Sequence, residues 1–299
     1  MTRDSLPPLH LLLALAVVAV WGTNFVVIKW GLGAFPPLTF AALRFTFAVL
    51  PAVFFLKRPK VGWRNLILYG LAIGTGQFGL LYIAMTSLIS PGLASLVVQV
   101  QAFFTIGLAM LIAGERVKGF QVAALALAAA GLAWLMAHAN ADATPLGVVL
   151  VLGAALGWAI GNTATRAAGP VNMLSYVVWA SIFSAPPLFV LALAVEGWPA
   201  MSHAVTHAGP AAWACVLWQS VGNTIFGYTA WGWLLARHPA ATVAPLALMV
   251  PVFGMGASAL LLGEPLAAWK LVAAALVLSG LAINTLWPRF AARRAVGAA

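Results

Sequence analysis

The stretch VAPLALMVPVFGMGASALLL, residues 243–262, contains no charged side chain. About 20 apolar residues are enough for an α-helix to cross the hydrocarbon core of a bilayer. Similar apolar runs recur along the whole chain, beginning with residues 9–20. Strands of a membrane barrel would instead alternate apolar and polar residues over about ten positions. The sequence therefore predicts an all-α integral membrane protein.

The composition supports this fold class. The 299 residues are 64% hydrophobic and 7% charged, with a mean hydropathy of +1.03. A soluble domain carries about 25% charged residues to cover its surface. The single cysteine, Cys215, excludes an intramolecular disulfide and a thiolate metal cluster. We expect no metal and no cofactor. The first apolar run continues into Trp21-Gly22-Thr23-Asn24 without a small-residue cleavage site, so no cleaved signal peptide is expected.

Apolar runs between charged or Pro/Gly-rich breaks predict ten membrane-spanning helices. The stretch between Gly197 and Pro210 is expected to be a long loop. The predicted spans are residues 9–30, 38–56, 65–86, 91–113, 118–137, 146–167, 172–195, 211–235, 240–262 and 267–287.

The net charge of +10 would also be typical of a nucleic-acid-binding protein, but the basic residues lie mainly between spans. Ten spans place both termini on one side. Positive residues favour the cytoplasmic side of a membrane. A cytoplasmic placement leaves only Lys29, Arg44 and Lys270 of the 15 basic residues elsewhere. We therefore predict a multi-pass protein of the bacterial inner membrane with both termini in the cytoplasm, and no nucleic-acid partner.

The chain also repeats itself. Gly114-Glu115 opens the fifth predicted span and Gly263-Glu264 opens the tenth. Further matches are Gly131 with Gly280, Tyr82 with Trp231, and the equally spaced pairs Trp21/Lys29 and Trp158/Arg166. A repeat of five spans is odd, so its second copy must enter the membrane inverted, as in many secondary transporters. We predict repeats at residues 1–140 and 141–299 around a central cavity near the midplane.

Several motifs resemble one family. They are Trp21-Gly22-Thr23-Asn24-Phe25 with Lys29, Leu43-Arg44-Phe45, Ala94-Ser95-Leu96 through Gly114-Glu115-Arg116, and Gly263-Glu264. In order and spacing they resemble EamA-type members of the drug/metabolite transporter superfamily, and more narrowly its bacterial aromatic amino acid exporters. The resemblance implies ten helices in an inverted 5+5 arrangement, a cavity lined mainly by helices 1, 3, 4, 6, 8 and 9, and amino acid export by alternating access.

The same resemblance points to residues that shape the helices. Family members often carry proline where this chain has Ala102, whereas the matching Pro251 is present, so the gating kinks are expected to be asymmetric. Pro91 and Pro245 are further gating or structural candidates. Arg44 lies within a span, where a charge is costly, so it should face a partner, a cavity or a route to the interface. Its role is either structural or gating.

Polar and aromatic residues inside spans give the candidate substrate site. Amides in spans prefer a cavity or another helix, and indole rings can stack on aryl groups or hold an ammonium. Packing between helices is the alternative for each. Gln101 lies two residues after Gln99, so at most one of the pair should face the cavity. The candidates are Trp21, Asn24, Gln77, Tyr82, Gln99, Trp158, Asn162, Trp179, Asn223 and Trp231.

No aspartate or glutamate lies well inside a predicted span. Proton-coupled cation exporters depend on such a carboxylate. Glu115 and Glu264 stand before helix starts and are expected to accept free backbone N–H groups there. The sequence favours gradient-driven export of aromatic and other neutral amino acids by a monomer or weak oligomer. The alternatives are another metabolite or a lipophilic cation as substrate and, more distantly, a membrane-embedded enzyme, for which no nucleophile–base pair is evident.

Overall fold

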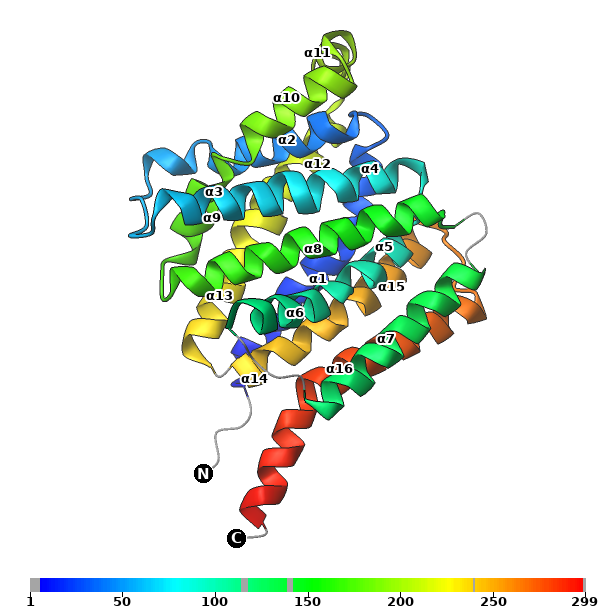
Figure 1. Cartoon of the computed structure of the whole chain (residues 1–299). Coiled ribbons are helices and arrows are strands. Elements are labelled where there is room, and N and C mark those ends of the chain that lie inside the picture. Colours follow the sequence, from blue (N-terminus) through cyan, green and yellow to red (C-terminus); the bar gives the residue numbers. More distant parts are fainter. Residues whose placement is uncertain (1–5, 114–117, 139–141, 239, 298–299) are drawn as a thin grey trace.

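The computed structural model describes residues 6–113, 118–138, 142–238 and 240–297, and most of these residues are helical. Within those ranges no strand forms, and one isolated antiparallel bridge joins Ile89 and Ala143. The helices pack into one bundle (Figure 1), with α7 and α16 side by side along one edge. The motif Gly114-Glu115-Arg116 lies outside the described residues.

In the first half, two of the long helices change type within the span. A π-helical segment, η2 (Leu71–Gly79), joins α3 to α4, and a 3₁₀ segment, η3 (Val98–Val100), joins α5 to α6. A second 3₁₀ turn, η1 (Ala52–Phe54), follows α2. The α-helices are α1 (Pro8–Gly31), α2 (Pro37–Val49), α3 (Trp63–Gly70), α4 (Leu80–Ser87), α5 (Pro91–Val97), α6 (Gln101–Ala113) and α7 (Gly119–His138).

The second half repeats these interruptions. The π-helical segment η4 (Trp218–Phe226) joins α12 to α13, and the 3₁₀ segment η5 (Ala244–Met249) joins α14 to α15. The α-helices are α8 (Pro145–Ala168), α9 (Met173–Ser181), α10 (Ala185–Val195), α11 (Trp198–His207), α12 (Pro210–Leu217), α13 (Gly227–Arg237), α14 (Ala240–Val243), α15 (Val250–Leu262) and α16 (Ala268–Gly297).

Nine helical stretches of the described chain are long and apolar enough to cross a membrane. They correspond to all the predicted spans except the eighth. The eighth span forms an unbroken helical run from Pro210 to Arg237, but its centre holds Gln219, Ser220 and Asn223, which lower its hydropathy. The chain is therefore an all-α membrane protein, with one span that is more polar than the rest.

One local expectation was wrong. The predicted loop between Gly197 and Pro210 contains helix α11, because Trp198-Pro199 begins a helix and no breaker follows until Gly209. A proline at the first helical positions costs nothing there, since its missing N–H would be unpaired. The seventh predicted span is present as one stretch, Met173–Val195, although its regular α-helix is interrupted between α9 and α10 at residues 182–184, just before Pro186 and Pro187.

The two halves pack in a paired manner. Helix α1 lies against α15 and the η4–α13 region, while its counterpart α8 lies against α6 and the α3–η2 region. Likewise α2 packs on α10, and α7 packs on α16. Each half thus surrounds the first helix of the other half, which is the arrangement expected of an inverted repeat.

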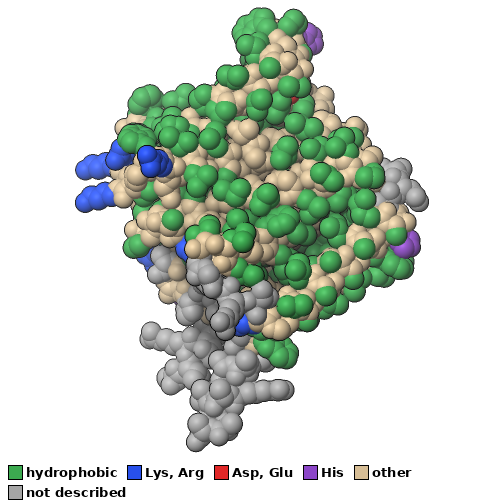
Figure 2. Space-filling view, in the orientation of Figure 1, with side chains coloured by type: hydrophobic (Ala, Val, Ile, Leu, Met, Phe, Trp, Pro, Cys, Tyr) green, Lys and Arg blue, Asp and Glu red, His purple; other side chains and the backbone are tan. Residues whose placement is uncertain are grey.

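The outer surface is suited to lipid. Apolar side chains cover most of the face shown in Figure 2, and lysine and arginine side chains gather toward one end of the helices. Large apolar residues such as Leu111, Leu260 and Val195 are exposed on the helices. In the connection before α3, Lys57, Arg58 and Lys60 are exposed. The hydrophobic belt and the basic end are what a membrane-spanning bundle requires.

Candidate substrate cavity

Two neighbouring cavities lie between the halves. The larger has a volume of about 590 Å³ and reaches the connection at residues 169–171 after α8. We call it the outer cavity because it reaches that end of the bundle; the name does not refer to the outside of the cell. The smaller, here called the inner cavity, has a volume of about 30 Å³. Four residues line both cavities and so form their shared boundary: Trp21, Trp158, Tyr228 and Val250.

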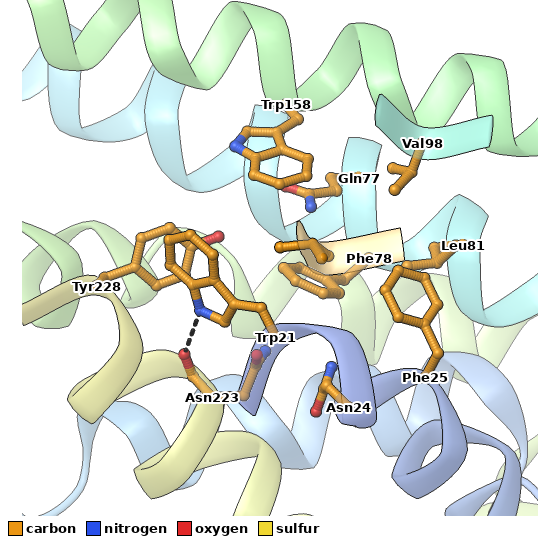
Figure 3. A pocket seen from close by; sticks show the side chains of 11 residues that line it. Trp21, Asn24, Phe25, Gln77, Phe78, Leu81, Val98, Trp158, Asn223 and Tyr228 are labelled. Carbon is orange, nitrogen blue, oxygen red and sulfur yellow. Dashed lines mark hydrogen bonds between the residues drawn. The ribbon is translucent and has the colours of Figure 1, made fainter. Parts of the chain in front are cut away.

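Most of the sequence-predicted site residues meet at these cavities. Five line the inner cavity: Trp21, Asn24, Gln77, Trp158 and Asn223 (Figure 3). The outer cavity adds Gln99, Asn162 and Trp231 to Trp21 and Trp158. These residues come from both halves of the chain, so neither half alone builds the walls.

Tyr82 and Trp179 lie elsewhere. The Tyr82 hydroxyl donates to Gln219 Oε1 at 2.9 Å and accepts from Arg44 Nη1 at 3.2 Å. Trp179 Nε1 donates to the carbonyl of Leu56 at 2.9 Å. Both polar groups are therefore satisfied within the protein, and neither residue lines the inner or the outer cavity.

Gln99 and Gln101 both line the outer cavity, contrary to the expectation that at most one would. The reason is the 3₁₀ segment at residues 98–100. With about three residues per turn, side chains two positions apart point about 120° apart instead of the about 160° of an α-helix. The local change of helix type brings both amides to the same wall.

Trp21 is held at the boundary by the π-helical segment η4. Its indole Nε1 donates to the carbonyl of Asn223 at 3.4 Å (Figure 3). Its ring centroid lies 5.4 Å from that of Tyr228 and 5.3 Å from that of Trp231. A π-helical turn disturbs the regular backbone hydrogen bonding and recurs at functional sites. Here it aligns three aromatic rings along one wall.

The amides differ in how far the protein satisfies them. Asn162 Nδ2 donates to Gln101 Oε1 at 2.9 Å, so this pair links the two halves. Among the predicted site residues on the cavity walls, three buried amide atoms have no hydrogen-bond partner within the described residues: Asn24 Oδ1, Gln77 Oε1 and Gln99 Nε2. Buried polar groups are normally hydrogen-bonded, so unpaired ones at a cavity wall are suited to a polar ligand.

The described lining of the two cavities is aromatic, aliphatic and neutral polar, without a charged side chain. A charged group lies nearby: Arg44 is fully buried, donates to Thr224 Oγ1 and stacks on Phe78. The predicted partner of Arg44 is therefore provided by neutral hydroxyl groups and an aromatic ring.

The acidic residues serve the helix ends. Glu264 accepts from the Gly92 backbone N–H at 3.1 Å and from Ser90, so it caps α5 of the other half and not the helix that follows it. Lys270, only 1% exposed, lies 3.0 Å from carboxylate oxygens of both Asp142 and Glu264. We call Asp142, Glu264 and Lys270 the ionic cluster. The expected cap at Glu115 lies outside the described residues.

The candidate prolines stand at helix starts. Pro91 begins α5 beneath Glu264, Pro245 lies at the start of η5, and Pro251 at the start of α15. The 3₁₀ segment of the second half is longer than that of the first, in which no proline follows Val98. The two 3₁₀ interruptions are thus unequal in length, and asymmetric gating stays a prediction.

The sequence-based prediction missed four aromatic wall residues, Phe25, Tyr69, Phe78 and Tyr228. Tyr228 lies three positions before Trp231, and this helical spacing could have revealed it. Phe78 directly follows Gln77, and adjacent residues do not share a face on a regular α-helix. Both nevertheless line the inner cavity, as do the adjacent residues Asn24 and Phe25 of α1, so sequence spacing alone did not reveal Phe78.

A polytopic helix bundle with two paired halves and a cavity between them is the architecture of a secondary transporter. The sequence model of the EamA-like transporter family matches residues 8–137 and 145–286. The chain belongs to the EamA-like transporter family.

Two relatives support the family assignment, and a solved structure shares the fold. A "Probable amino-acid metabolite efflux pump" of Escherichia coli (strain K12) is 42% identical over 95% of this chain and 96% of its own. A protein of the same name from Salmonella typhimurium is 41% identical over 91% of this chain and 93% of its own. One crystal structure shares the fold, with a TM-score of 0.63 and 19% identity over 94% of this chain and 97% of that one.

Proposed function

We propose that this transporter exports aromatic and other neutral amino acids across the bacterial inner membrane. The observation that carries the proposal is the cavity wall, where the rings of Trp21, Trp158 and Trp231 stand beside neutral amides. A zwitterion needs donors for its carboxylate, aromatic faces or acceptors for its ammonium, and apolar walls for its side chain. The names of the two efflux-pump relatives support the same substrate class.

Alternating access is proposed from the difference between the two ends of α8. Before its start, the ionic cluster ties Asp142 to Glu264 and Lys270. After its end, the outer cavity reaches the connection at residues 169–171. The excess of basic residues supports placing this second end in the cytoplasm, together with both termini. The described conformation is then closed toward the outside and accessible from within.

The proposed transport is driven by the substrate gradient. A carboxylate relay would need an acid in the cavity, and the described linings of both cavities contain none. The same lining disfavours the lipophilic-cation alternative, which would be served by a buried carboxylate, and a sugar-phosphate substrate, which needs several converging basic groups. It offers no nucleophile–base pair for the membrane-enzyme alternative.

The substrate class can be tested in proteoliposomes loaded with labelled phenylalanine, tryptophan, threonine or a sugar phosphate. We expect flux of the amino acids, fastest for the aromatic ones. Flux of the sugar phosphate alone would refute the proposal. Collapse of the proton gradient by an ionophore should leave the rates unchanged. A loss of flux would instead show proton coupling.

A further inference from the structure

Arg44 carries a positive charge that no carboxylate neutralises in the described part of the chain. Its side chain is 0% exposed. Nε and Nη2 donate to Thr224 Oγ1 at 3.1 and 2.9 Å, and Nη1 donates to the Tyr82 hydroxyl at 3.2 Å. These acceptors are neutral. The three described acidic residues bind elsewhere, Glu196 at the start of α2 and the other two in the ionic cluster.

Phe78 stands between this charge and the inner cavity. Arg44 Cζ lies 3.4 Å from the centroid of the Phe78 ring, and Phe78 lines the inner cavity. The face of an aromatic ring attracts a cation but does not cancel its charge. Charges away from water are weakly screened, so the field of the guanidinium extends through the ring. The inner cavity is therefore electropositive although no basic residue lines it.

The inner cavity also fits a carboxylate in size and in hydrogen bonding. Its volume of about 30 Å³ exceeds the roughly 10–15 Å³ that one water molecule needs, so it can hold a small polar group but not an aromatic side chain. Asn24 and Gln77 flank it (Figure 3), each only 3% exposed. The amide nitrogens of both residues point into the cavity (Figure 3), whereas Asn24 Oδ1 and Gln77 Oε1 are buried without a hydrogen-bond partner within the described residues. The N–H groups can therefore donate to a small anion.

We propose that Arg44, acting through Phe78, selects substrates that carry a carboxylate and orients them. The carboxylate enters the inner cavity, the ammonium lies against Trp21 and Tyr228, and the side chain remains in the outer cavity. This inference rests on the proposed export of amino acids and adds the reason for their selection. It also excludes substrates that carry a cationic group alone.

Binding can be measured by quenching of tryptophan fluorescence in detergent, because Trp21 and Trp158 line the inner cavity. The probes are phenylalanine, 3-phenylpropionate (a carboxylate alone) and phenylalanine amide (an ammonium alone). We expect 3-phenylpropionate to bind at least about tenfold more tightly than the amide. Equal binding, or tighter binding of the amide, would overturn the inference.

Substitutions at Arg44 and at Thr224 separate an effect of the Arg44 charge on binding from an effect on folding. Arg44→Gln should abolish the tenfold preference, and Arg44→Lys should retain most of it. Thr224→Asp places a carboxylate beside the guanidinium without removing it, so it should also abolish the preference. Thr224→Asn is its neutral match and should keep the preference. If Thr224→Asp and Thr224→Asn show the same preference, the charge of Arg44 does not select the substrate.

The result of the binding experiment does not depend on the result of the flux experiment. Phenylalanine flux in proteoliposomes without any carboxylate preference would overturn the role of Arg44 and leave the proposed function in place. A strong carboxylate preference in binding without amino acid flux would refute the proposed function and support the selection by Arg44.

Discussion

Trp21 reaches its place because residue 227 has no side chain. A Cβ added to Gly227 would overlap the indole Nε1 of Trp21. The ring lies against this glycine and donates to the carbonyl of Asn223. Trp21 lines both cavities, so its position decides the shape of their shared boundary.

We therefore expect Gly227→Ala to displace the Trp21 ring and to lower amino acid flux by about tenfold, since small misplacements of binding groups have large effects. The measurement is initial flux in proteoliposomes at equal reconstituted amounts. Gly256→Ala is the matched control, because an added Cβ there meets nothing within 4 Å. If both variants transport alike, the position of Trp21 does not matter for transport.

At the scale of single residues, the sequence predicted which residues line the cavities better than it predicted which residues contact each other. The pairing of Trp21 with Asn24 and of Trp158 with Asn162 followed from helical spacing, and all four line a cavity. Tyr82 could not be placed in the same way. Its hydroxyl is used by Arg44 and Gln219, two residues far apart in sequence, and such long-range polar contacts leave no local pattern.

Among the elements, α2 depends on a distant residue for its start. Its first turn follows Pro36, which has no side-chain cap. Glu196, at the end of α10, instead accepts from the backbone N–H of Leu38 at 2.5 Å and of Thr39 at 3.0 Å. A carboxylate is stabilising there because it satisfies free N–H groups and faces the positive end of the helix dipole. This contact ties α10 to α2.

Removal of this cap should be measurable as a loss of stability. We expect Glu196→Ala to lower the free energy of unfolding by about 1–2 kcal/mol, the usual cost of a lost helix cap with a charge contribution. Thermal unfolding in detergent is the measurement. Glu196→Gln keeps one acceptor and should lose less. Flux per folded molecule should stay unchanged, and an unaltered Tm in Glu196→Ala would contradict the assignment.

The spans were predictable because hydropathy depends on composition alone. The changes of helix type inside them were not. Residues 71–79 and 218–226 are π-helical without a proline in either stretch. Close packing accompanies this change: a Cβ on Gly157 of α8 would lie 2.7 Å from the carbonyl of Ala72 in η2. Such tertiary contacts decide the local geometry, and a single-sequence pattern does not contain them.

In the whole molecule, the ionic cluster joins the two halves at one end. Lys270 of α16 binds Asp142 in the connection before α8 and Glu264, which in turn caps α5. A buried ammonium between two carboxylates is costly to remove, because the acids would then repel each other. The repeat was visible in the sequence, but this cluster was not, since its members are brought together only by folding.

We expect Lys270→Met to open this end of the molecule. A cysteine introduced as Ala143→Cys in a Cys215→Ala background lies beside Asp142, and Ala143 is only 2% exposed. Labelling by a membrane-impermeant maleimide from outside the cell should be at least about tenfold faster in Lys270→Met, the ratio given by a shift of about 1.4 kcal/mol. Lys118→Met is the control, because it removes an exposed lysine that is not part of the ionic cluster. Equal labelling of the two would contradict a closing role.

The central claim is that the two halves together hold an amino acid at the shared cavity boundary. Counterflow of labelled phenylalanine in proteoliposomes tests it most directly, with Trp158→Ala and Asn162→Ala compared with Trp287→Ala, which removes a half-exposed tryptophan near the end of the last span. At equal reconstituted amounts, we expect both cavity variants to lose most of the counterflow and Trp287→Ala to keep it. Equal effects of all three substitutions, or no counterflow in the unaltered protein, would contradict a substrate site at this boundary.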